Sequence, residues 1–254
     1  NINFLNTFSE TFMKKISLLI LSLFMFGLFA DELPANFSKY QAHYAFKCDH
    51  GEKCFAAFDK YMNAPAVKAM NLEVDLYALQ HQGWNEATHQ ISYYYKNADE
   101  YAAAGNVFST SKSGLMFRDA MNKLGAELTM ATMTRHIAAN VSDEAGSELV
   151  TVNWDLNVSN PVKFLPLWKE LSKSTEKYDW NADACGVQQH ILGNNGNGIT
   201  HSVWCTFASP QQALSFLDNY ATTSEFAEYN SNVSEHRTFL RSHMAYLLKE
   251  YNPD

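Results

Sequence analysis

The chain has 254 residues, of which 46% are hydrophobic and 14% aromatic, and its formal net charge is −8. This composition is typical of a globular protein, and the acidic excess argues against nucleic acid or anionic lipid as a partner. The length allows one large domain or two domains of about 100 to 120 residues each.

The first 30 residues resemble a targeting segment. Met13 is followed by two lysines, by an apolar run from Ile16 to Phe26 and by the small residue Ala30. This pattern predicts a signal peptide over residues 13–30, and residues 1–12 are expected to be an extension without a structural role. Since the apolar run is shorter than the roughly 20 residues that span a bilayer, we expect a periplasmic or secreted protein with no membrane contact after cleavage.

Two similar segments follow, which we expect to be two copies of one unit, over residues 37–140 and 147–250. The first copy contains a predicted strand ("YQAHYAFK"), a helix over 54–70, and a hairpin built from 73–83 and 87–97. A second helix is predicted to begin at Ala98, after the capping residue Asn97, and a last strand lies near 128–138.

The second copy repeats this order. A strand is predicted over 149–159, a helix over 161–178, and a hairpin from 185–193 and 200–208 around the turn "GNNGNG". Ser209 and Pro210 begin a helix over 210–229, and the last strand is predicted over 238–247. Both copies therefore read βαββαβ, and we predict an α+β fold of two tandem ferredoxin-like units.

The four cysteines fall into two local pairs. Cys185 and Cys205 are nearly symmetric about the hairpin turn, which places them opposite one another on adjacent strands. Cys48 and Cys54 bracket a short turn. An oxidising compartment favours two disulfides. The alternative is a metal site around Cys48, Asp49, His50 and Cys54, but no second ligand pair lies nearby, and we expect no metal.

The order of elements and the helix-end pattern "SEFAEY" resemble the dimeric α+β barrel superfamily, which includes the antibiotic-biosynthesis-type monooxygenases, here as a tandem fused pair. The resemblance covers nearly all of residues 37–250. It implies a pseudo-dimeric barrel with a site inside the barrel or between sheet and helices. Members range from cofactor-free monooxygenases to isomerases, haem enzymes and stress proteins, so it implies architecture more than activity.

Strand parity indicates which side chains share a face. It predicts a polar cavity between the sheets, with candidate catalytic residues His43, His81, Asp155 and His190 and candidate ligand-binding residues Tyr94 and Trp204. A histidine near neutrality can move protons, and a carboxylate can orient it. The alternative is that the histidines shared by the copies are structural. We expect His89 and His201 to be structural, and we leave both a catalytic and a structural role open for His81 and His190.

Two functions fit these observations. The first is an enzyme that binds or transforms a small organic molecule, as a monooxygenase-like protein without a bound cofactor. The second is a non-catalytic ligand-binding or stress-related protein that uses the same cavity. A base hydrogen-bonded to a second titratable group in a closed pocket would favour the enzyme, and a wide aromatic cleft would favour binding.

Overall fold

The computed structural model describes residue 33 and residues 37–81, 83, 86–142, 149–193 and 198–252. The expected extension, signal peptide and cleavage position lie outside these residues. No helix in the described part of the chain is both long enough and apolar enough to cross a membrane.

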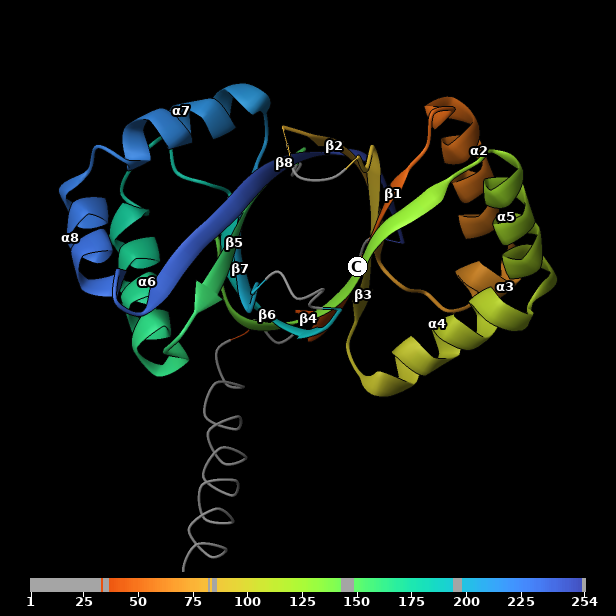
Figure 1. Ribbon diagram of the computed structural model, residues 1–254, viewed down its shortest axis with the longest axis horizontal. Helices are drawn as coiled ribbons and strands as arrows, with labels where there is room; N and C mark the ends of the chain where they lie inside the picture. The colour runs from red at the N-terminus through yellow and green to blue at the C-terminus, as the bar shows by residue number, and fades with distance from the viewer. Residues whose placement is uncertain are drawn as a thin grey trace, which may run out of the picture.

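Eight strands form one closed antiparallel barrel, in the order β1-β3-β2-β8-β5-β7-β6-β4 (Figure 1). The strands have these bounds: β1 Tyr40–Lys47, β2 Val74–Gln80, β3 His89–Tyr95, β4 Glu127–Val141, β5 Val150–Val158, β6 Ala184–Leu192, β7 His201–Phe207 and β8 Arg237–Tyr251.

The helices lie outside the barrel in two groups on opposite sides (Figure 1). One group comprises α2 Gly51–Met62, α3 Pro65–Lys68, α4 Ala98–Thr110 and α5 Lys112–Lys123. The other comprises α6 Pro161–Thr175, α7 Pro210–Tyr220 and α8 Ser224–Val233. The barrel thus separates two helix-covered outer faces from one interior.

The prediction of two tandem ferredoxin-like units is wrong. The strands do not form two separate sheets, because β4 pairs with both β1 and β6, and β8 pairs with both β2 and β5. Each of these two strands has 15 residues, which is long enough to bridge the two parts of the chain. Closure leaves no strand edge unpaired, and this satisfies backbone groups that two open sheets would expose. The boundaries at 37–140 and 147–250 stay a prediction.

Local capping explains where the predicted helices are divided. The helix expected over 54–70 stops at Met62 and restarts at Pro65, where the proline occupies the first turn. The helix predicted over 210–229 ends at Tyr220, and a new helix, α8, begins after Thr223, whose side chain accepts a hydrogen bond from the Phe226 amide.

Both predicted disulfides are present. Cys185 and Cys205 are direct partners across the β6–β7 ladder, and Cys48 is joined to Cys54 in the first turn of α2. The Cys48–Cys54 bond links the end of β1 to α2, and the Cys185–Cys205 bond links β6 to β7. One bond therefore lies in each half of the chain.

Candidate functional site

The interior of the barrel is polar and holds two cavities. The larger has a volume of about 520 Å³ and the smaller about 40 Å³. Four residues line both cavities and therefore form the wall between them: His43, Gln90, Asn153 and Gln188. The larger cavity has the size of a small-molecule site, whereas the smaller has room for about one or two waters.

His43 is tied into this wall by short hydrogen bonds. Its Nδ1 lies 3.0 Å from Ser92 Oγ and 3.2 Å from Gln90 Nε2. Burial is the main reason that the pKa of His43 falls to about 4, and the nearby His190 lowers it further while a hydrogen bond with Gln188 opposes the change. His43 is therefore a neutral imidazole at pH 7.

Aromatic rings form one end of the larger cavity. Phe37 stacks on Trp204 with ring centroids 6.3 Å apart, and both rings meet the edge of His136. The indole lies so close to Gly186 that a Cβ there would meet ring atoms at 2.4 Å. Glycine at this position therefore allows Trp204 to lie flat inside the barrel.

Two buried polar atoms of this aromatic group have no hydrogen-bond partner among the described residues: Trp204 Nε1 and His136 Nδ1. The other ring nitrogen of His136 lies 3.2 Å from Gln41 Oε1 and 3.1 Å from Gln188 Nε2. Burial, followed by the charge of His43, lowers the pKa of His136 to about 3, so this ring is also neutral. An unpaired buried polar atom costs about 1 to 3 kcal/mol, which a bound molecule can recover.

Three aromatic and acidic residues lie together elsewhere along the same cavity. Asp75 Oδ2 accepts hydrogen bonds from Tyr77 Oη at 2.7 Å and from Tyr94 Oη at 2.8 Å. Burial raises the pKa of Asp75 to about 6, and repulsion from Glu250 acts in the same direction, while the two tyrosine bonds oppose it. Burial also raises the pKa of Tyr94.

A chain of polar contacts faces the smaller cavity. Ser202 Oγ donates to Asp155 Oδ1 and lies 2.7 Å from His190 Nε2, and Arg241 Nε donates to Asp155 Oδ2 at 2.7 Å. Burial alone would raise the pKa of Asp155, but the bonds from Ser202 and Arg241 hold it below its usual value. Because Ser202 gives its proton to Asp155, it accepts one from His190, which leaves His190 Nδ1 as the basic nitrogen.

The barrel brings together five of the six site residues expected from the sequence. His43, Asp155 and His190 line the smaller cavity, and His43, Tyr94 and Trp204 line the larger. His81 does not join them: it is exposed, follows the end of β2 and has a φ of 55°. The alternation of faces stops where a strand ends, so parity no longer locates its side chain.

His89 and His201 face the helices and not the cavities. His89 stacks on Phe46, and His201 packs against Phe164 of α6. Each imidazole Nδ1 also contacts the preceding threonine hydroxyl. These contacts are those of structural histidines.

Several cavity residues were missed by the sequence analysis. Arg241, His243 and Glu250 lie on β8, whose pairing with β2 and β5 is set by barrel closure. The only sequence signal that could have found them is the alternation along 237–251, and bulges interrupt it.

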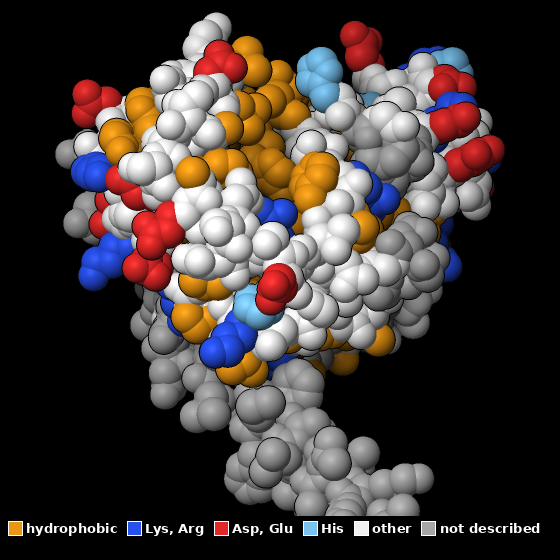
Figure 2. All heavy atoms as spheres, turned by 60° about the vertical axis from the view of Figure 1, so that its left-hand side comes forward, with side chains coloured by type: hydrophobic (Ala, Val, Ile, Leu, Met, Phe, Trp, Pro, Cys, Tyr) orange, Lys and Arg blue, Asp and Glu red, His pale blue; other side chains and the backbone are white. Residues whose placement is uncertain are grey.

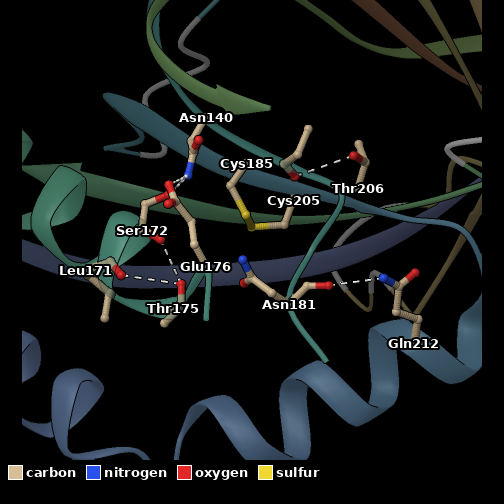
Figure 3. The surroundings of a disulfide bond; sticks show 11 residues. Asn140, Leu171, Ser172, Thr175, Glu176, Asn181, Cys185, Cys205, Thr206 and Gln212 are labelled. Atoms are coloured by element: carbon tan, nitrogen blue, oxygen red, sulfur yellow. Dashed lines mark hydrogen bonds between the residues drawn. A yellow bond between two sulfur atoms is a disulfide. The ribbon is translucent and has the colours of Figure 1, made fainter. Parts of the chain in front are cut away.

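A third cavity, of about 350 Å³, lies between the outer face of the barrel and helices α6 to α8. Its wall includes Trp168, Tyr220, Phe226 and the disulfide between Cys185 and Cys205. Figure 3 shows this disulfide facing polar side chains of α6 and the following segment. With this side of the molecule turned forward, Figure 2 shows hydrophobic side chains gathered in the hollowed part of the surface.

Comparison with known proteins shows the fold. No family model and no curated protein sequence matches the chain. Two solved bacterial structures, each named "putative monooxygenase", are similar. The protein from Fusobacterium nucleatum subsp. nucleatum has a TM-score of 0.57 and 14% identity, covering 85% of this chain and 95% of its own. The protein from Lactobacillus acidophilus has a TM-score of 0.55 and 10% identity, covering 85% and 96%.

An anthrone oxidase-like protein is also similar, with a TM-score of 0.54 and 10% identity over 86% of this chain and 94% of its own. At these identities the likeness concerns the fold alone. The chain therefore shares the barrel architecture of these three structures.

Proposed function

We propose that this protein binds a small, planar organic molecule in the larger barrel cavity and transforms it by proton transfer. The observation that carries the proposal is the pair of unpartnered buried atoms, Trp204 Nε1 and His136 Nδ1, on the aromatic wall of a cavity of about 520 Å³. Rings favour a flat ligand, and the two atoms favour a ligand with polar groups at its edge.

His43 and Ser92 supply the proton-transfer step. Both line the cavity, and with Ser92 donating to His43 Nδ1, the serine oxygen can take a proton from a ligand hydroxyl as it passes its own to the imidazole. An anion forming on the ligand beside His43 would raise the pKa of the imidazole and so favour this transfer.

The names of the similar structures suggest oxidation of the resulting anion by O₂. In the balanced step a C–H carbon of the ligand becomes a carbonyl that contains one atom of O₂, the other atom leaves as water, and the ligand supplies all four electrons. A monooxygenase-like activity on a phenol or enolisable ketone is therefore the first to test. The two disulfides fit an oxidising compartment, and we propose a periplasmic or secreted location on that ground.

The test combines ligand binding with O₂ consumption for a panel of planar phenols. His43→Gln should lower the rate about 100-fold or more while changing binding less than tenfold, because the ring contacts remain. His81→Gln is the matched control and should leave both unchanged, since this histidine is exposed. Equal rates for the His43 variant and the wild type would overturn the proton-transfer proposal.

The second candidate is non-catalytic ligand binding. It is favoured by the cavity under α6 to α8, where seven of the sixteen described lining residues are aromatic and none is a histidine or a carboxylate. This function would be favoured if the phenols bind without turnover. Their affinity should then fall when Phe226 is replaced and stay unchanged when Trp204 is replaced.

A further inference from the structure

Three carboxylates meet at the wall of the larger cavity. Asp75 on β2 lies directly opposite Glu250 on β8, and Glu73 precedes Asp75 by two residues, on the same face of the chain. One ligand oxygen from each of the three lies within 4.8 Å of the others. Barrel closure therefore brings together residues that are far apart in the sequence.

The pairing of Asp75 with Glu250 is unfavourable when both carboxylates are charged. Like charges directly opposite on neighbouring strands destabilise a sheet. Among the described residues that line the cavity there is no lysine or arginine. Lys249, the neighbour of Glu250, instead forms an ion pair with Asp59.

Asp75 supplies a second, separate observation. The residue is only 6% exposed, its Oδ2 is held by two tyrosine hydroxyls, and its Oδ1 is buried with no hydrogen-bond partner. A buried carboxylate oxygen normally has a partner. The oxygen without a partner belongs to a carboxylate that lines the same cavity as Glu73 and Glu250.

From this geometry we propose that Glu73, Asp75 and Glu250 bind a hard divalent cation, with Ca²⁺ the preferred ion. Ca²⁺ binds oxygen ligands at about 2.4 Å, so one ion can contact two oxygens up to about 4.8 Å apart, and a small inward movement of the exposed Glu250 side chain brings a third within reach. Glu250 is exposed and Glu73 partly exposed, which leaves room for waters to complete the coordination. Mg²⁺ is disfavoured because it requires stricter octahedral geometry. This site departs from our sequence-based expectation of no metal.

The experiment uses the full chain, freed of metal with a chelator, and Tb³⁺ as a luminescent substitute for Ca²⁺. Tyr77 and Tyr94 both contact Asp75, so excitation of tyrosine should sensitise bound Tb³⁺, and added Ca²⁺ should displace it. Ca²⁺ should also raise the melting temperature of the metal-free protein by several degrees, since it binds the folded state.

Two variants locate the site. Asp75→Asn and Glu250→Gln should each weaken Tb³⁺ and Ca²⁺ binding by about tenfold or more. The Glu250 residue is exposed, so its variant tests the site even if the buried one fails to fold. Glu170→Gln, an exposed carboxylate on α6, is the control and should bind like the wild type.

The proposal is overturned if the wild type shows neither sensitised luminescence nor a Ca²⁺-dependent shift in melting temperature. It is also overturned if Glu250→Gln stabilises the metal-free protein but leaves Ca²⁺ binding unchanged, which would mean that the carboxylates share a proton and hold no ion. Displacement of Tb³⁺ by Mg²⁺ at concentrations lower than those of Ca²⁺ would contradict the choice of ion.

Discussion

Under the helices of the first half of the chain, aromatic rings fill the space, whereas the second half holds a cavity of about 350 Å³ in the corresponding place. Phe58 in α2 contacts the rings of Tyr61, Phe117 and Tyr251. In the second half, Phe226 of α8 packs on Tyr220 and Tyr229 but also borders the cavity. The same kind of helix layer is thus tightly packed on one side of the barrel and loosely packed on the other.

Inside the barrel the two halves differ in polarity. Phe46 pairs with His89 in the first half, and Leu156 pairs with His201 in the second half. The residues one position earlier, Ala45 and Asp155, therefore occupy equivalent places in the two halves. By the same register, Met130 corresponds to Arg241. Ala45 belongs to an apolar cluster against which Met130 packs, while the second half places a buried ion pair at these positions. Polar chemistry in the smaller cavity is therefore supplied mainly by the second half.

The largest expected effect comes from transplanting the first-half residues into the second half. Asp155→Ala alone or Arg241→Met alone leaves one charge buried without its main partner and should cost about 3 to 5 kcal/mol. The double variant removes both charges and should cost clearly less than the sum of the two. Chemical denaturation of all three variants measures this, and additive losses would contradict the ion-pair interpretation.

A second comparison tests the packing difference. Phe58→Ala should cost about 3 to 5 kcal/mol, because the ring is enclosed by other rings. Phe226→Ala should cost only about 1 to 2 kcal/mol, because this ring is partly exposed and already borders empty space. Equal losses in the free energy of unfolding would show that the cavity is not open in solution.

The pH dependence of stability tests the wall between the barrel cavities. His43 has a folded pKa of about 4 against an ordinary value of 6.5, so the unfolded state takes up the proton first as the pH falls. Stability from this residue is complete above pH 6.5 and should decline by about 3 kcal/mol between pH 6.5 and 4. His43→Gln should remove this contribution from the measured decline, while the contribution of buried His136 remains, and His81→Gln should leave the decline as in the wild type. A decline unaffected by the His43 variant would show that the imidazole is not buried as a neutral group.

The disulfides should give the smallest difference. Replacing Cys185 and Cys205 by alanine opens a link across 20 residues, whereas replacing Cys48 and Cys54 opens a link across six. Because each link restricts the unfolded chain, its loss should lower the free energy of unfolding by about 3 kcal/mol for the longer link and about 2 kcal/mol for the shorter one. Melting experiments on the two double variants should show the larger loss in the second half, and the reverse order would point to a packing role for the shorter link.

The sequence predicts features that depend on neighbours along the chain. Cys185 and Cys205 could be paired because the hairpin turn places them symmetrically, and the start of α4 follows from the capping side chain of Asn97. Alternation along the strands was enough to direct His43 and Asp155 toward the interior.

The strand pairs that close the barrel could not be located from the residues, although the resemblance to a known superfamily implied a pseudo-dimeric barrel. The ladders that join the halves, β2 with β8 and β4 with β6, bring together residues far apart in the chain, and this is why the prediction of two tandem ferredoxin-like units fails. Glu250 and Arg241 were missed for the same reason. His81 was misplaced because the backbone changes direction at a positive φ beyond the strand.

The most direct test of the barrel interior as the functional site is a crystal structure of the protein soaked with naphthol, a planar phenol. Naphthol should occupy the larger barrel cavity, with its rings against Trp204 and its hydroxyl within hydrogen-bond distance of Ser92 or His136. Naphthol bound only beneath α6 to α8, with the barrel cavity holding water alone, would contradict the assignment of the barrel interior as the functional site.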